Sequence, residues 1–110
     1  MTASRIERRE RLQTAVDEVV TSWPGVSRRP MFGCQSYVAD GVLFAVLSDQ
    51  GLSLTRLTDD QRAALARTAS VEPFAAGERV VRRWATVQVD PDALESVIPA
   101  LQQSYDAAIV

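Results

Sequence analysis

The chain has 110 residues, of which 46% are hydrophobic, and a formal net charge of −2. A chain of this length and composition is expected to fold as one domain, residues 1–110, around a single hydrophobic core. The slightly negative charge argues against bulk attraction to DNA or to an acidic membrane. The chain has one cysteine, no histidine and no apolar run near the ~20 residues of a membrane span. We therefore expect a cytoplasmic protein without disulfides.

The first predicted element is an amphipathic helix that begins after Ser4 and ends near Ser22. Ser4 and Glu7 form a capping-box pattern, in which each side chain satisfies an unpaired backbone N–H group. The alternating charges of residues 5–11 indicate a solvated face. Apolar residues at helical spacing form a stripe on the other face: Leu12, Val16, Val19 and Trp23.

After a turn at Pro24-Gly25 and a linker over residues 26–30, three strands are expected over residues 31–38, 42–47 and 52–57. Asp40-Gly41 and residues 48–51 connect them, because glycine accepts the positive φ of a hairpin turn at no steric cost. The middle strand is apolar on both faces, which favours a central place in the sheet.

A second capping box at Thr58 and Gln61 begins a helix over residues 58–69. Two further strands follow over residues 71–74 and 79–89. Pro73 favours a sheet edge for the former. In the latter, alternation places four residues on one face unless a bulge intervenes: Arg82, Trp84, Thr86 and Gln88.

Pro99 interrupts the helical repeat at the C-terminal end of the chain, because proline removes a helix hydrogen bond and clashes with the preceding turn. We therefore predict a short first turn from Pro91 and a helix that restarts near Ile98 and ends near Ala108.

The predicted order is α-β-β-β-α-β-β-α, an α+β fold. Short strands with tight turns indicate a five-stranded antiparallel sheet, covered by helices on one face only as a two-layer α/β sandwich. The other face is expected to be open and is assigned four residues: Ser53, Thr55, Trp84 and Thr86.

The residue types argue against several chemistries. Without histidine or a spaced carboxylate cluster, no metal or other cofactor is expected. Cys34 has no histidine to act as its base, and its strand position is typical of a small buried hydrophobe. No glycine motif that could cradle a phosphate is present. General acid–base catalysis by a single aspartate or glutamate stays open, although no such residue is singled out by the sequence.

Two basic pairs remain, Arg28-Arg29 and Arg82-Arg83, the second of which precedes Trp84. Arginine beside an aromatic ring on an exposed strand can bind nucleic acid through phosphate contacts and base stacking. The alternative is a solvated strand face on which Trp84 fills a groove or a dimer contact. Because tryptophan is enriched at interface centres, the open face is a candidate for self-association or for docking a partner.

Several motifs resemble the N-terminal domain of the TfoX/Sxy family, which includes regulators of bacterial DNA-uptake competence. The resemblance spans roughly residues 12–108. Its most specific parts are Met31-Phe32-Gly33 and the spacing of Pro73-Phe74, Gly77 and Trp84. Cys34 departs from it, since a second glycine is common there. The residues that carry it are Trp23, Pro24, Gly25, Val26, Arg29, Pro30, Met31, Phe32, Gly33, Tyr37, Asp40, Gly41, Val71, Glu72, Pro73, Phe74, Gly77 and Trp84.

The resemblance implies a helix-flanked antiparallel sheet similar to the secretion-chaperone-like folds, and a non-enzymatic regulatory or interaction role. It carries no catalytic residue over. Phe32 is expected in the core and Gly33 at a close backbone approach. The competence regulators carry a second helical domain with no counterpart in these 110 residues, so full competence activation is not expected.

Three functional hypotheses follow. The first is a domain that acts through contacts with a partner protein or a second copy, in transcriptional or competence-related regulation. The second is a nucleic-acid-binding module that uses Arg28, Arg29, Arg82, Arg83 and Trp84. The third is a small-ligand binder or enzyme with a pocket at the sheet edge.

Overall fold

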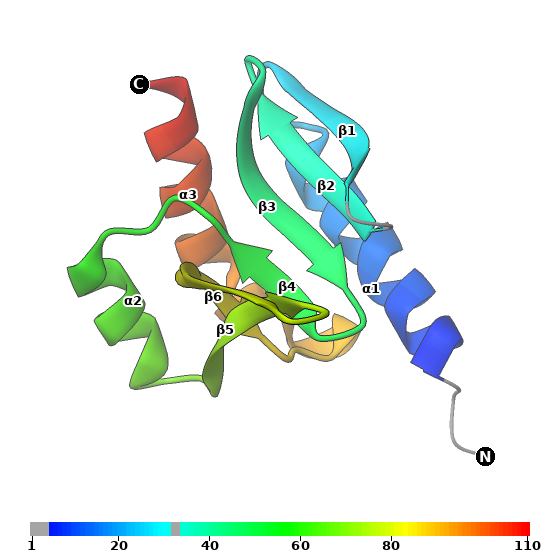
Figure 1. Ribbon diagram of the computed structural model, residues 1–110. Coiled ribbons are helices and arrows are strands. Elements are labelled where there is room, and N and C mark those ends of the chain that lie inside the picture. The colour runs from blue at the N-terminus through cyan, green and yellow to red at the C-terminus, as the bar shows by residue number, and fades with distance from the viewer. Residues whose placement is uncertain (1–4, 32–33) are drawn as a thin grey trace.

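The computed structural model describes residues 5–31 and 34–110, which form an α+β fold built on one antiparallel sheet (Figure 1). The strand order among these residues is β1-β2-β3-β4-β6-β5. The strands are β1 Val26–Met31, β2 Cys34–Ala39, β3 Val42–Ser48, β4 Gly51–Leu54, β5 Val71–Ala76 and β6 Arg79–Val87. The helices are α1 Arg5–Val20, α2 Asp59–Ala66, the 3₁₀ helix η1 Pro91–Ser96 and α3 Ile98–Ile109.

The sheet has six strands rather than the predicted five, because the predicted linker over residues 26–30 is part of β1. This strand pairs with β2, with Val26 opposite Ala39 and Met31 opposite Cys34. As an edge strand it leaves four of its six side chains exposed, so it lacks the alternation that marks a half-buried strand. Pro30 is tolerated because an edge strand does not need every N–H group. Phe32 and Gly33 lie outside the described residues.

Helices α1 and α3 lie behind the sheet in Figure 1, and the main core fills the space between them and the strands. Of the predicted stripe of α1, Leu12 and Val16 are buried and Val19 and Trp23 are partly buried against the core, while the neighbouring Val20 is fully buried. An aromatic group continues the core: the ring of Tyr105 lies 4.9 Å from that of Trp23 and 5.5 Å, nearly edge-on, from that of Phe44.

Several local predictions are confirmed. Asp40 and Gly41 both have positive φ, 51° and 83°, as a type I′ hairpin turn requires. The capping box at Thr58 and Gln61 has both of its hydrogen bonds, and its helix ends at Ala66, three residues earlier than expected. The C-terminal segment splits into η1 and α3 and restarts at Ile98.

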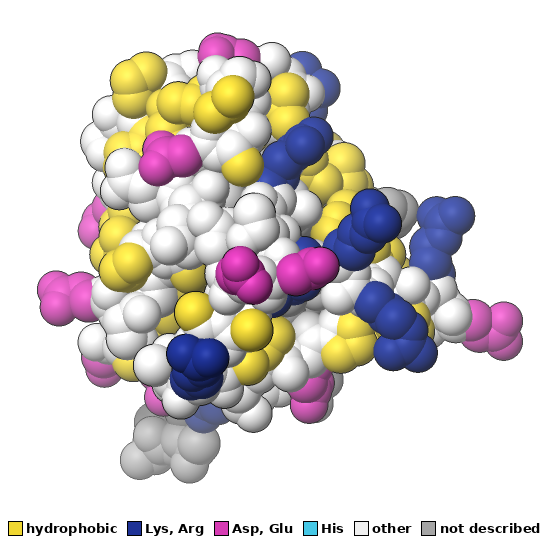
Figure 2. Space-filling model, turned by 90° about the vertical axis from the view of Figure 1, so that its left-hand side faces the viewer, with side chains coloured by type: hydrophobic (Ala, Val, Ile, Leu, Met, Phe, Trp, Pro, Cys, Tyr) yellow, Lys and Arg dark blue, Asp and Glu magenta, His cyan; other side chains and the backbone are white. Residues whose placement is uncertain are grey.

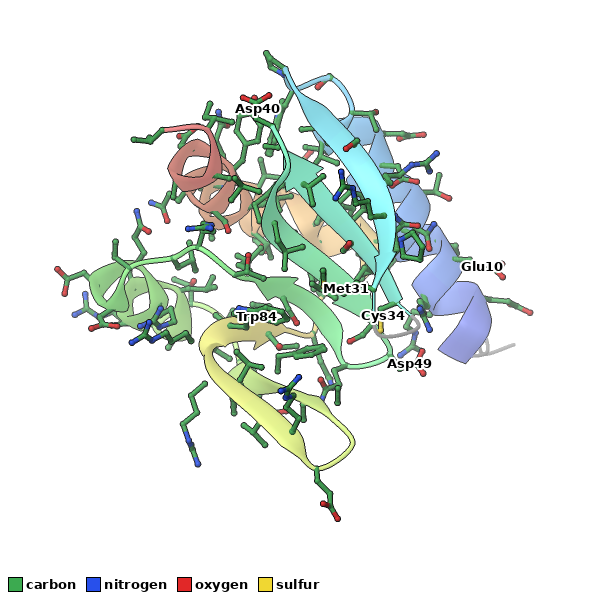
Figure 3. All side chains as sticks on the ribbon, turned by 45° about the horizontal axis from the view of Figure 1, so that its top comes forward. Glu10, Met31, Cys34, Asp40, Asp49 and Trp84 are labelled. Atoms are coloured by element: carbon green, nitrogen blue, oxygen red, sulfur yellow. The ribbon has the colours of Figure 1, made fainter. Side chains whose placement is uncertain are left out.

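A bulge in β6 reshapes the sheet. Pro73 lies opposite Ala85, and Phe74 lies opposite Val81, so residues 82–84 have no counterpart on β5. Beyond this bulge the β5–β6 hairpin turns across the side of the sheet that faces away from α1 and α3 (Figures 1 and 3). The backbone N–H of Ala75 there donates a 3.0 Å hydrogen bond to Gln50 Oε1 in the β3–β4 turn.

The predicted open sheet face is therefore covered over its centre. Ser53 is fully buried and Thr86 is 3% exposed, whereas both were expected on an open surface. Thr55 is half-buried, and its hydroxyl donates a hydrogen bond to the carbonyl of Leu43. It lies just after β4, because this strand ends at Leu54 rather than near residue 57. Strand alternation could not predict this cover, because it depends on where a three-residue bulge redirects a hairpin.

None of the described helices is long and apolar enough to cross a membrane.

Candidate interaction surface

We define the front face as the side of the sheet that faces away from α1 and α3. Directly opposed residues in antiparallel strands share a face. The register Arg29–Ser36–Val46–Ser53–Thr86 therefore places all five of these residues on the front, from edge strand β1 to β6.

The middle of the front face is a closed polar contact rather than a docking surface. The hydroxyls of Ser53 and Thr86 lie 2.7 Å apart and form a buried hydrogen bond. Thr86, predicted as an interaction residue, is therefore structural. Because both hydroxyls are buried, the bond satisfies groups that would otherwise lose hydrogen bonds to water.

Residues 82–84 lie in the β6 bulge, and this is the part of the prediction that remains on the surface. Arg82 and Arg83 are exposed, whereas Trp84 is half-buried with its ring 5.1 Å from that of Phe74. Arg62 of α2 holds the bulge, because its Nη1 donates to the carbonyl of Arg83 at 3.3 Å and to that of Leu57 at 2.7 Å. Arg62 thus connects the backbone that carries the arginine pair to the segment before α2.

The two arginines of β1 point to opposite sides, although the sequence grouped them. Arg28 lies opposite Tyr37 and donates a 2.9 Å hydrogen bond to Asp17 of α1, on the helix side. Arg29 lies on the front, four strand spacings from β6, or about 19 Å at ~4.8 Å per strand. Of the predicted nucleic-acid residues, Arg28 is therefore on the helix side and Arg29 on the front, whereas Arg82, Arg83 and Trp84 lie in the bulge, where no strand partner fixes a common face.

Asp17 binds both Arg28 and the buried Tyr37, so it connects the edge strand β1 to the core. Tyr37 donates a 2.7 Å hydrogen bond to the second carboxylate oxygen of Asp17. Burial, and next the bond to Asp17, raise the pKa of the Tyr37 hydroxyl well above its ordinary value of 10.0. This group is a structural link between β2 and α1.

Charge is unevenly distributed between the two sides of the fold. Residues 90–110, which form η1 and α3 behind the sheet, include no basic residue and four acidic ones: Asp90, Asp92, Glu95 and Asp106. The β5–β6 hairpin carries three arginines, Arg79 and the bulge pair, against Glu72 and Glu78. In Figure 2 arginine side chains gather along the right-hand side, which corresponds to the front of Figure 1.

The residues of the sequence motif lie at turns and register changes. Gly41 is in the β2–β3 turn, Gly77 is in the turn at the hairpin tip, and Pro73 and Phe74 flank the register shift of the bulge. Met31, half-buried, ends β1. The structural role of the motif stays a prediction.

Cys34, expected as a buried hydrophobe, is only half-buried at the start of β2, where it lies opposite Met31 of β1. Among the described residues no three metal-ligating side chains lie close enough together to hold an ion. The candidate interaction surface is the exposed arginine pair of the β6 bulge.

The helix-backed antiparallel sheet and its arginine-bearing bulge define a small α+β domain. Residues 18–108 match the family model of the TfoX N-terminal domain, and the chain belongs to that family. A search of curated proteins found no match.

Proposed function

We propose that this TfoX N-terminal domain is a non-enzymatic regulatory module that binds an acidic surface of a partner protein through Arg82 and Arg83 of the β6 bulge. The observation that carries the proposal is the exposed pair Arg82 and Arg83 on a backbone fixed by Arg62. A fixed backbone lowers the entropy that binding costs, and arginine is enriched among the residues that dominate interface energies.

The charge distribution supports an acidic partner. Two copies related by a two-fold axis would place the same arginine pair opposite itself if they met through the bulge. Such a contact is repulsive, whereas an acidic surface of another protein is complementary to it. We therefore expect a monomer by size-exclusion chromatography with light scattering. A dimer that Trp84→Arg dissociates would overturn the choice of partner.

Nucleic acid is the second candidate, favoured by the exposure of Arg29, Arg82 and Arg83. The packing of Trp84 against Phe74 counts against it, because base stacking requires an aromatic face that a nucleotide can reach. In a gel shift over increasing salt, binding that weakens steeply with salt would favour this candidate over the protein partner.

The decisive experiment compares single charge reversals in the native cytoplasm. Arg82→Glu and Arg83→Glu alter the bulge, and Arg11→Glu makes the same charge change on α1 behind the sheet. After crosslinking and pull-down, a specific acidic partner should be recovered by the wild type and Arg11→Glu and lost from both bulge variants. Purified partner should then bind the wild type at least tenfold more tightly than either bulge variant. Equal recovery by all four proteins would contradict the proposal.

A further inference from the structure

A hollow of about 430 Å³ lies apart from the front-face bulge, where α1 passes the end of the sheet. Its walls come from three segments: one turn of α1, the β3–β4 turn, and the chain that leaves β6. Asp49, at the β3–β4 turn, is labelled in Figure 3 close to α1. The volume falls within the range of small-molecule sites, about 300–1,000 Å³.

Arginines replace apolar residues where the inner stripe of α1 reaches this hollow. Arg9 stands three residues before Leu12 and seven before Val16, so it continues the line of the buried stripe. Arg8 stands four residues before Leu12, on the flank of the same face. Arg9 is partly buried, with 30% of its side chain exposed, so the prediction that residues 5–11 form a solvated face is wrong there.

The walls are held by hydrogen bonds before any ligand arrives. Arg9 pairs with Asp49 at 2.9 Å, which neutralises both. Gln50 is held at both ends, because its backbone N–H donates to Ser48 Oγ and its side chain accepts from Ala75. These three residues therefore lose little entropy when a ligand binds.

Two charged groups at the hollow are unused. Arg8 and Asp90 are among its lining residues, both are exposed, and neither side chain makes a hydrogen bond or ion pair with the described residues. Asp90 is the N-cap residue of η1, yet its side chain makes no capping bond. The hollow therefore offers one guanidinium and one carboxylate to a ligand, with Leu12 and Val89 as apolar wall.

We propose that this hollow binds a small zwitterion of the α-amino-acid class, with its carboxylate on Arg8 and its ammonium on Asp90. A guanidinium binds a carboxylate through two parallel hydrogen bonds, and a carboxylate is the complementary acceptor for an ammonium group. A ligand with only negative charge is repelled by Asp90, and one with only positive charge is repelled by Arg8. The site is independent of the proposed protein-docking function.

The test is titration of the purified full chain with the free proteinogenic amino acids, followed by two-dimensional NMR of the backbone amides. At least one amino acid should shift the amides of Gly51 and Val89. Its N-acetyl and carboxamide derivatives, each of which lacks one charge, should bind at least tenfold more weakly.

Variants then locate the two charges. Arg8→Gln and Asp90→Asn should each raise the Kd at least tenfold while the rest of the spectrum stays folded. The matched controls Arg11→Gln and Asp92→Asn, which change a pair next to the hollow, should bind like the wild type. The absence of any amino-acid shift at millimolar concentration, or binding by either site variant that equals that of the wild type, would overturn the proposal. Because Arg83→Glu should leave this binding unchanged, the site and the docking function can fail separately.

Discussion

The hydroxyl of Tyr37 on β2 donates a 2.7 Å hydrogen bond to Asp17 on α1, and this contact joins the sheet to the helix that covers it. Tyr37 is fully buried, and the other carboxylate oxygen of Asp17 accepts from Arg28. One acidic residue thus ties a core strand, an edge strand and a helix together.

Tyr37→Phe should lower the free energy of unfolding by about 1.5 kcal/mol, at the lower end of the usual value for a hydrogen bond to a charged acceptor because Asp17 keeps Arg28. Urea denaturation at neutral pH measures the change. The control is Ser22→Ala, which removes an exposed side-chain bond to the carbonyl of Val19 and should cost much less. Similar losses of unfolding free energy in the two variants would show that the buried Tyr37 bond stabilises the fold no more than the exposed Ser22 bond does.

Alkaline pH should reveal the same bond. The folded state holds the Tyr37 proton at a raised pKa, whereas the unfolded chain releases it near the ordinary value of 10.0. The contribution is therefore complete below about pH 10 and is lost as pH rises further, by up to ~1.4 kcal/mol per pH unit. Denaturation from about pH 9 to 11 should show a steeper fall for the wild type than for Tyr37→Phe. Parallel curves would contradict this assignment.

Gly51→Ala should be among the most damaging single changes in the chain. Its added Cβ would lie 2.3 Å from the carbonyl oxygen of Val87, at a φ of +128°. We expect a loss of about 3 kcal/mol or more, because both the clash and the backbone strain must be relieved. Gly77→Ala is the control: its φ is +62° but no atom lies within 4 Å, so about 1 kcal/mol is expected. Thermal unfolding should rank the two variants in this order.

The buried pair Ser53 and Thr86 should behave as a coupled unit. Thr86→Val leaves the Ser53 hydroxyl buried without its partner and should cost about 1–3 kcal/mol. The double variant Ser53→Ala/Thr86→Val removes both hydroxyls and should cost less than the sum of the single changes. Additive losses in the double-mutant cycle would mean that the two hydroxyls do not depend on each other.

The arrangement of the bulge depends on Arg62 of α2, which binds the carbonyls of Leu57 and Arg83 and pairs with Asp59. Arg62→Met keeps the apolar stem but removes these donors. It should therefore mobilise residues 82–84, which ¹⁵N relaxation of their amides would detect, at a modest cost of about 1–2 kcal/mol. Asp59→Asn, which alters only the exposed partner, should leave these amides rigid.

The sequence by itself determined the features that depend on local backbone sterics. Asp40-Gly41 specified its turn, Thr58 and Gln61 specified a helix start, and Pro99 specified the break before α3, because each acts within a few residues of itself. The same local patterns were enough for the α+β class and for the motifs that mark the TfoX N-terminal family.

Only the tertiary structure decided which residues lie together at the bulge, in β1 and at the hollow. The bulge of residues 82–84, the separation of Arg28 from Arg29, and the pair Arg9–Asp49 all depend on contacts between segments that are distant in the chain. Strand alternation carries no information on which edge a segment occupies or where a hairpin turns back. The sequence nevertheless contained one indication of the hollow, because Arg9 continues the apolar stripe of α1 and Arg8 lies on its flank. Packing then determined which residues these two arginines face.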